Sequence, residues 1–198
     1  MKGIVFSEFF KHVEQVHGEV ALDEIIVRAE LPHGGAYTNV GTYPFDEMLA
    51  LVGAHVAVTG ALVPEVLDGF GQHCFASWVQ NSGQFFTRER GLFTILSEVN
   101  AFHEREVRKL YPDAELPTFT VEARDDRVLV LGYHSTKRLT ELAIGVIKGA
   151  AQHLGQEVGI TAETVTGPEG EYARLRIELL AASVTDQPVM ACPFQTRT

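Results

Sequence analysis

The chain has 198 residues, of which 45% are hydrophobic and 21% are charged, and these ordinary globular proportions exclude a disordered, collagenous or coiled-coil protein. At about 150 residues per domain, the length predicts one domain with an extension. The 16 Lys and Arg against 26 Asp and Glu give a net charge of −10, which disfavours nucleic-acid and anionic-membrane binding, because both need a basic surface.

The cysteine content and the apolar runs predict a compartment. Cys74 and Cys192 are too few and too far apart for a disulfide framework or a CxxC zinc site, so we expect a reducing cytoplasm. Glu8 interrupts any apolar stretch near the first residue, so no signal peptide is predicted. The longest apolar run, from Met48 to Pro64, falls short of the ~20 residues that span a bilayer. We therefore expect a soluble cytoplasmic protein.

Four helices are predicted in the first part of the chain, because apolar residues recur there at three- and four-residue spacing. The first helix ends near Gly18, a short second one follows, and a Gly-, Thr- and Pro-rich loop occupies 31–44. Helix resumes near Phe45 and again after Pro64, a natural first-turn proline. The apolar sets of the four helices are Phe6, Phe9, Phe10, Val13 and Val16; Leu22, Ile25, Ile26 and Ala29; Met48, Leu49, Leu51, Val52 and Val56; and Val66, Leu67, Phe70, Cys74, Phe75 and Trp78.

The second part of the chain mixes helix and strand. A long helix is stopped by Pro112, and beyond Pro117 the period changes to two, which predicts strands. Phe119 alternates with Val121, and Val128 with Val130 and Gly132, across the polar turn ARDDR. The order of elements predicts an α+β fold with a roughly four-stranded antiparallel sheet. The predicted elements are a loop at 81–87, a helix at about 91–110, strands near 119–121 and 128–132, a helix at about 140–154, and strands at 157–165 and 173–180 joined by the turn GPEGE.

His103 is the most informative position of the predicted long helix. Apolar residues and this histidine step by three, four, four and three residues, so the imidazole lies on an apolar stripe and is expected to be buried. A buried neutral imidazole needs partners for its nitrogens; a metal bound through Nε2 is one solution, and a backbone carbonyl is the alternative. The stripe is Leu96, Val99, His103, Val107 and Leu110.

The segment YHSTKR, from Tyr133 to Arg138, lies between a predicted strand and a predicted helix. If it is extended, Tyr133, Ser135 and Lys137 point to one side, and two hydroxyls and an ammonium together suit a carboxylate or phosphate ligand. The start of the next helix adds free backbone N–H groups. The alternative is an ordinary strand-to-helix turn with solvated polar residues.

Five segments resemble, in this order, the bacterial heme-nitric oxide/oxygen-binding (H-NOX) family, to which the heme domain of soluble guanylate cyclase is related. They are MKGIVFSEFF, GGAYTNVGTYPFDE, FGQHCF, HEREVRKLYPDAELPTF and YHSTK, and the resemblance runs from Met1 to about Leu180. It implies a buried heme b (iron protoporphyrin IX), a proximal histidine on the long helix, and a Tyr-x-Ser-x-Arg motif that holds the two propionates. An iron porphyrin needs an axial nitrogen, an apolar slot, and cations or hydroxyls for its carboxylates, and this chain has each.

The resemblance transfers cofactor-binding roles by position. Tyr133 and Ser135 match the propionate pair, and Pro117 matches the proline that presses on the porphyrin. The family arginine falls on Lys137, with Arg138 next to it. The planar bidentate fork is therefore replaced by a point charge or supplied one residue later.

The position of the proximal iron ligand depends on the alignment register. From the segment LSEVNAFH, His103 matches the family histidine; counted back from Pro112 without a gap, Glu104 takes its place, one residue or about 100° away. His103 is the predicted ligand, because imidazole is the better ligand for heme iron. The extra residue is expected as a π-bulge or a longer helix end between Glu104 and Tyr111. A hydrolytic pair of His103 and Glu104 is disfavoured, because adjacent helix residues do not face each other.

The resemblance also predicts the lining of the gas-binding side. Family members that hold oxygen have a distal tyrosine, and the matching residue here is Leu142. None of the lining side chains is a strong hydrogen-bond donor, the thiol being a weak one, so the chain resembles the nitric-oxide-selective branch, in which oxygen is poorly held. Each lining residue also has a plain interpretation as a core residue. The predicted lining is Ile4, Phe9, Cys74, Trp78, Leu142 and Val146.

Together these inferences predict a non-enzymatic gas sensor for nitric oxide, with carbon monoxide as a second candidate ligand. The resemblance implies that nitric oxide weakens or breaks the iron–His103 bond, and that a helical lobe (about 1–62) then shifts against a heme-ligating α/β lobe (about 63–180), with the heme between them. The signal passes to a separate histidine kinase or cyclic-di-GMP synthase or phosphodiesterase. A polar tail, 181–198, is expected to fray. The alternative is a small-ligand-binding module of the same fold with weakened or lost heme binding.

The remaining histidines have no predicted role. His12 and His17 are five residues apart, about 140° around a helix, so they do not share a metal-binding face. His73 stands next to Cys74, but no second pair lies at zinc-site spacing, so a core or solvated pair is the preferred interpretation.

Overall fold

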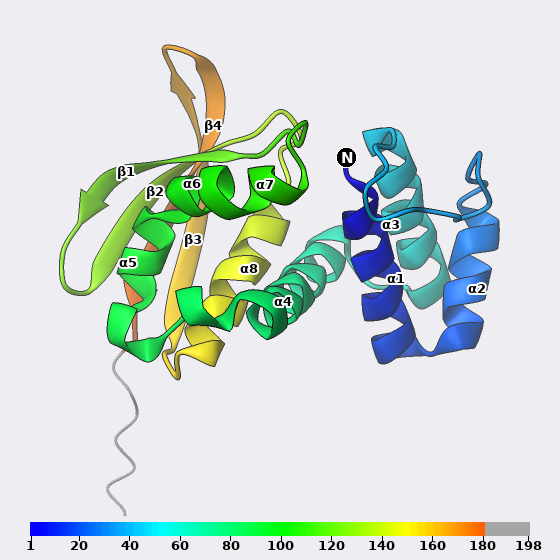
Figure 1. Ribbon diagram of the computed structural model, residues 1–198, viewed down its shortest axis with the longest axis horizontal. Helices are drawn as coiled ribbons and strands as arrows, with labels where there is room; N and C mark the ends of the chain where they lie inside the picture. Colours follow the sequence, from blue (N-terminus) through cyan, green and yellow to red (C-terminus); the bar gives the residue numbers. More distant parts are fainter. Residues whose placement is uncertain (181–198) are drawn as a thin grey trace, which may run out of the picture.

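A computed structural model describes residues 1–180, and the predicted tail lies outside the described residues (Figure 1). The fold is α+β, as the sequence predicts. The elements are α1 (Gly3–His17), α2 (Glu19–Arg28), α3 (Phe45–Thr59), α4 (Val63–Ser82), the short 3₁₀ helices η1 (Gly83–Phe85) and η2 (Arg88–Arg90), α5 (Leu92–Ser97), α6 (Val99–Phe102), the π-helical segment η3 (His103–Val107), α7 (Arg108–Leu110), β1 (Thr118–Arg124), β2 (Val128–His134), α8 (Thr140–His153), β3 (Val158–Gly167) and β4 (Gly170–Leu179).

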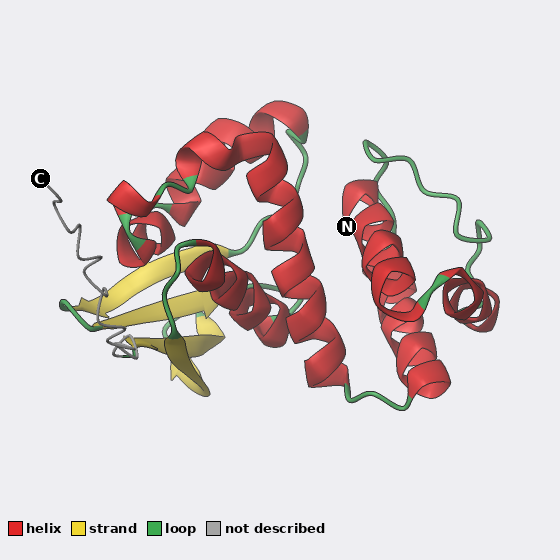
Figure 2. Ribbon diagram, turned by 90° about the horizontal axis from the view of Figure 1, so that it is seen from below, coloured by secondary structure: helices red, strands yellow, loops and turns green. Residues whose placement is uncertain are grey.

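Two hydrophobic clusters form the core. The first joins α1, α2, α3 and the first half of α4, and it contains Phe6, Phe9 and Leu51, which are fully buried. The second joins the other half of α4, α5, α8 and one face of the sheet. In Figure 2, α1 to α3 stand on one side of α4, while the sheet and the remaining helices lie on the other. The helix α4 therefore belongs to both clusters.

The first helix shows where periodicity predicts burial and where it does not. Phe6, Phe9 and Val13 are buried in the first cluster, and the helix ends before Gly18, whose φ of +86° suits glycine. The predicted inward Val16 is exposed. It lies in the last turn, at an outer corner of the molecule where every residue from 14 to 20 is exposed, so nothing covers it.

The sheet has the strand order β1-β2-β4-β3, with all neighbours antiparallel. Leu129 and Leu131 of β2 and Leu175 and Ile177 of β4 form its buried face, under the helices.

The predicted alternation of β2 is corrected by this arrangement. Val128, Val130 and Gly132 alternate with the residues that face the core, so they belong to the opposite face of the strand. In the segment VLVLGY both alternating sets of residues are apolar, so a period of two alone could not predict which set faces the core. Val121 of β1 is half-exposed, beside a register shift between Val121 and Ala123.

The crossing of α4 and α8 depends on glycines. A Cβ atom at Gly71 would lie 2.3 Å from the Leu142 carbonyl oxygen, and one at Gly145 would lie 2.1 Å from the Asp68 carbonyl oxygen. The two backbones therefore touch, and no larger residue fits at either position. This contact fixes where α8 lies relative to α4, between the two clusters.

The predicted long helix at 91–110 is not continuous. It bends at Glu98, whose φ and ψ are −101° and 7°, and it becomes π-helical from His103 to Val107. The expected π-bulge is thus confirmed, and it begins at the histidine itself. Leu110, the last residue of the predicted apolar stripe, is 72% exposed. The stripe fails there because one inserted residue turns the following residues by about 100°.

Within residues 1–180, no single helix has the length and apolar character needed to cross a membrane. Only α3 and α4 taken together have it, and they are bent by 112° relative to each other.

Candidate functional site

His103 lies where the α-helix becomes π-helical, and it is partly buried rather than fully buried as expected. Burial is the largest effect on the imidazole and lowers its pKa, while a hydrogen bond to the Pro117 backbone acts in the opposite direction. Proline has no N–H, so the group of Pro117 that acts on the imidazole is its backbone carbonyl. The ring of Phe119 lies 6.4 Å away, centroid to centroid.

Glu104, the alternative in the other register, is exposed. Its carboxylate accepts a hydrogen bond of 2.7 Å from the Arg108 guanidinium, one turn along the helix. The Glu104 carboxylate is thus paired with a cation at the surface, whereas the neighbouring His103 imidazole lies beside the backbone of Pro117, the residue before β1. The geometry favours His103 as the residue that could bind a metal.

Tyr133 and Ser135 lie together at the end of β2. Tyr133 is buried in the second cluster, and burial raises the pKa of its hydroxyl. Hydrogen bonds with the Ser135 side chain and the Leu139 backbone have the opposite, smaller effect on this pKa. The expected extended run is wrong beyond His134, where the strand ends. The Ser135 hydroxyl accepts from the Lys137 N–H at 3.2 Å, and this local bond turns the chain. Lys137 therefore does not continue the row of Tyr133 and Ser135.

Both cations of the turn are paired with carboxylates. The Lys137 ammonium donates to Glu115 at 2.5 Å, and the Arg138 guanidinium lies 3.1 Å from Glu171. Lys137 is mostly buried, while Arg138 is exposed and has a φ of +49°. Any carboxylate ligand at this turn has to compete with Glu115 and Glu171 for the two charges.

Two open hollows flank the turn. One of about 220 Å³ is lined by the hydroxyls of Tyr133 and Ser135 and by Arg138. The second, of about 710 Å³, is lined by Ser135, Lys137 and Arg138 together with acidic residues of the β3–β4 turn. Hydroxyl donors and two cations thus border solvent-accessible space, a donor set that suits carboxylates.

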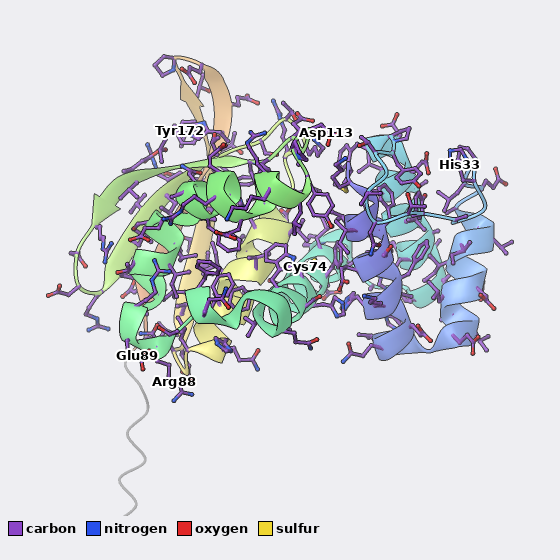
Figure 3. All side chains as sticks on the ribbon, in the orientation of Figure 1. His33, Cys74, Arg88, Glu89, Asp113 and Tyr172 are labelled. Carbon is purple, nitrogen blue, oxygen red and sulfur yellow. The ribbon has the colours of Figure 1, made fainter. Side chains whose placement is uncertain are left out.

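The residues predicted to line the gas-binding side are only partly brought together. Phe9 and Cys74 are buried in the first cluster, and Leu142 packs against it. Figure 3 shows Cys74 on the part of α4 that lies next to α1. Val146, one turn along α8, packs against the second cluster instead. Neither cluster includes the partly buried Ile4 and Pro117 or the 42% exposed Trp78, and their lining roles stay predictions.

Other histidines meet in pairs among α1, α3 and α4. The rings of His12 and His73 lie 5.3 Å apart, and those of His17 and His55 lie 4.8 Å apart. His73 is also 3.1 Å from the buried Glu8 carboxylate. Even so, no group of three His, Cys, Asp or Glu side chains within residues 1–180 could hold a metal ion.

Several contacts near His103 were not found from the sequence. The Asn100 side chain bonds to the Phe119 backbone, Lys2 forms an ion pair of 2.7 Å with Asp113, and Glu115 holds Lys137. Figure 3 shows Asp113 beside the start of α1. Asn100 stands one helical turn before His103, which is a usable signal, whereas the two ion pairs join residues more than twenty positions apart and leave no local pattern.

Comparison with known proteins assigns the family. A family model described as Haem-NO-binding (HNOB) matches residues 2–162. The chain belongs to the H-NOX family. Heme-based gas sensing is what this fold serves, and H-NOX domains bind heme.

Solved H-NOX structures match most of the chain. An Fe(II) unliganded H-NOX protein from K. algicida is 31% identical, with a TM-score of 0.82 over 91% of this chain and 97% of that one. Its A71G mutant is also 31% identical, with a TM-score of 0.83 over 92% and 98%. An H-NOX protein from S. oneidensis in the Fe(II)NO ligation state is 24% identical, with a TM-score of 0.80 over 91% and 100%. A search of curated proteins found no match.

The donor set of the site fits a heme. His103 is a partly buried imidazole beside the Pro117 backbone carbonyl, and histidines that bind metals characteristically donate their second N–H to such a group. Tyr133 and Ser135 place hydroxyls near each other, with Lys137 and Arg138 on the same turn. The apolar surroundings come from the two clusters on either side.

Proposed function

We propose that this H-NOX chain is a cytoplasmic, non-enzymatic nitric oxide sensor that regulates a separate partner. The observation that carries the proposal is the position of His103, a partly buried imidazole at the start of the π-helical segment and beside the Pro117 backbone. An imidazole that gives one ring N–H to a backbone carbonyl keeps its other nitrogen for a metal, which is what an axial ligand requires. The family and this geometry together support His103 as the proximal ligand.

The other residues of the site hold the two carboxylates of the cofactor. Tyr133 and Ser135 donate hydroxyl hydrogen bonds, and Lys137 or Arg138 supplies the positive charge after exchanging its glutamate partner. When bound, heme supplies an iron that takes up nitric oxide and whose bond to His103 is thereby weakened or broken.

Loss of the iron–His103 bond would free the helix that carries His103 from the heme. The following π-helical segment has poorer hydrogen-bond geometry than an α-helix, so it is the part of the helix that we expect to yield. Beyond it, Asp113 forms an ion pair with Lys2 at the start of the N-terminal lobe. We expect the lobe of about 1–62 to shift against the lobe of about 63–180, and a histidine kinase or a cyclic-di-GMP enzyme to respond to the shift.

We base gas selectivity on Phe9, Cys74 and Leu142, which the first cluster brings together; Trp78, whose indole N–H is a donor, is 42% exposed and belongs to neither cluster. Phe9 and Leu142 have no polar group, and burial raises the pKa of the Cys74 thiol, which stays protonated and is a weak donor. Bound oxygen carries partial negative charge and needs a donor, whereas nitric oxide and carbon monoxide do not. We therefore expect the chain to bind the latter two gases and to hold oxygen poorly.

An absorption spectrum of the purified, reduced protein tests the proposal. We expect a Soret band typical of histidine-ligated heme, which shifts on addition of nitric oxide to that of a heme without the histidine. A colourless protein that does not take up hemin would contradict the proposal. That outcome would favour the second candidate, a small-ligand-binding module of the same fold with lost heme binding. The ion pairs of Lys137 and Arg138 with glutamates support this candidate, because both cations already have carboxylate partners.

The assignment of the ligand is tested by His103→Gly. We expect this variant to lose heme unless free imidazole is added, because imidazole can occupy the vacated space and supply the nitrogen. Retention of a normal histidine-ligated spectrum without imidazole would mean that another histidine binds the iron.

A further inference from the structure

The Asn100 side chain makes hydrogen bonds to the edge strand of the sheet. The Asn100 Nδ2 donates to the Phe119 carbonyl oxygen at 2.6 Å, and the Phe119 N–H donates to the Asn100 Oδ1 at 3.0 Å. β1 is the edge strand, paired on one side with β2. Both polar backbone groups of Phe119 are thus bound by one carboxamide, which acts as a partner strand one residue long.

Only a carboxamide satisfies this pair of bonds. It presents one donor and one acceptor side by side, which matches the acceptor and donor of a strand residue. A carboxylate has no donor and would face the Phe119 carbonyl with like partial charge. An alanine would leave both partly buried backbone groups of Phe119 without their partner, at the cost that unsatisfied groups incur.

Asn100, with its two hydrogen bonds to Phe119, lies one helical turn before His103. Asn100 binds Phe119 of β1, and His103 lies beside the backbone of Pro117, two residues earlier in the same segment. The Phe119 ring lies between His103, at 6.4 Å, and Tyr133, at 5.4 Å, and is tilted against both by 54° and 49°. The helix is therefore attached to β1 through Asn100, on the N-terminal side of His103, while the π-helical segment begins at His103 and continues on its C-terminal side.

We propose that Asn100 is a positioning residue for His103: its two bonds to Phe119 hold the helix against β1 and set the orientation of the imidazole toward the heme iron. The inference rests on the proposed function, in which His103 is the iron ligand. It explains how the ring keeps its orientation although the helix loses α-helical hydrogen bonding directly after it. The fixed side of His103 is the Asn100 side, and the yielding side is the π-helical side.

The test compares the heme-loaded wild type with Asn100→Ala and Asn100→Asp. Resonance Raman spectroscopy gives the iron–histidine stretching frequency, and transfer to an excess of apomyoglobin gives the rate of heme loss. In both variants we expect the frequency to shift from the wild-type value and the rate of heme loss to rise roughly tenfold or more, the usual effect of removing a group that orients a metal ligand.

Asn39→Ala is the matched control, because the Asn39 side chain makes a hydrogen bond to Ser7 in the other lobe. It should retain the wild-type frequency and rate. If Asn100→Ala fails to fold, Asn100→Gln replaces it: this side chain keeps the donor and the acceptor but is one methylene longer, so it should fold and still shift the frequency.

Wild-type frequency and wild-type rate of heme loss in the folded Asn100 variants would overturn the inference and leave the proposed function intact. A wild type that binds heme without any iron–histidine vibration would overturn the proposed role of His103, and the Asn100 inference with it. The two failures are therefore distinguishable in one set of measurements.

Discussion

Leu142 shows what a single residue contributes to the site. It lies on α8 and packs against the cluster that contains Phe9 and Cys74, at the place where the resemblance puts a tyrosine in oxygen-holding relatives. Its side chain has no donor. In the proposed function, gas selectivity depends on the hydroxyl group that Leu142 lacks, and a substitution can supply it.

We expect Leu142→Tyr to slow oxygen dissociation from the reduced protein by roughly tenfold or more, because one hydrogen bond to a charged group contributes about 1.5–3 kcal/mol. Stopped-flow measurement of oxygen release gives the rate. Leu142→Phe is the control, since it adds the ring without the hydroxyl and should leave the rate near the wild-type value. Equal rates in the two variants would contradict the proposed basis of selectivity.

At the scale of elements, the contact between α4 and α8 illustrates what the sequence can and cannot predict. Both helices follow from their apolar spacing, and the π-helical segment follows from the one-residue conflict between two alignments. The glycine contact does not follow, because Gly71 and Gly145 look like weak helix positions until the facing backbone is known. Similarly, local patterns are enough to predict His103 and Tyr133 as candidate site residues, whereas the contact of Glu115 with Lys137 has no local pattern because the two residues are remote in sequence.

Gly145→Ala should destabilise the protein by about 1–3 kcal/mol, because its Cβ would overlap the Asp68 carbonyl oxygen and push the helices apart. Gly53→Ala in α3 is the matched control. Nothing lies within 4 Å of a Cβ there, and alanine favours a helix over glycine by about 0.5–1 kcal/mol, so this variant should be slightly more stable. Urea unfolding measures both changes. Changes of the same sign would contradict the close packing of α4 and α8.

At the scale of the whole molecule, the N-terminal lobe contains several neutral histidines. Burial lowers the pKa values of His12 and His55 to about 4, with neighbouring histidines as the further cause. His55 is 2% exposed, and neither of its ring nitrogens has a hydrogen-bond partner within residues 1–180. Protonation of either ring would place a charge inside the first cluster.

These two histidines make the stability of the protein depend on pH. In the unfolded chain the pKa of each histidine is about 6.5. Between about pH 6.5 and pH 4 these two histidines are therefore protonated in the unfolded chain but neutral in the folded chain. Stability is therefore full above pH 6.5 and is lost as the pH falls toward 4, by about 1 kcal/mol per histidine at pH 5.5. Urea unfolding at pH 7.5 and 5.5 measures the loss.

His55→Leu should reduce that loss by the share of one histidine, since leucine removes the titrating group. The explanation would be wrong if His55→Leu lost as much stability between pH 7.5 and 5.5 as the wild type.

The helix α4 has 20 residues and is about 30 Å long, and it is a wall of both clusters. Val66, Leu67, Phe70 and Cys74 pack toward α1 and α3, while Phe75 packs toward the sheet. A chain divided before Val63 would leave the first four side chains in water, at about 1.5–3 kcal/mol for each large one, which approaches the total stability of a domain. The segment before Val63 and the rest of the chain are therefore expected to be stable only together.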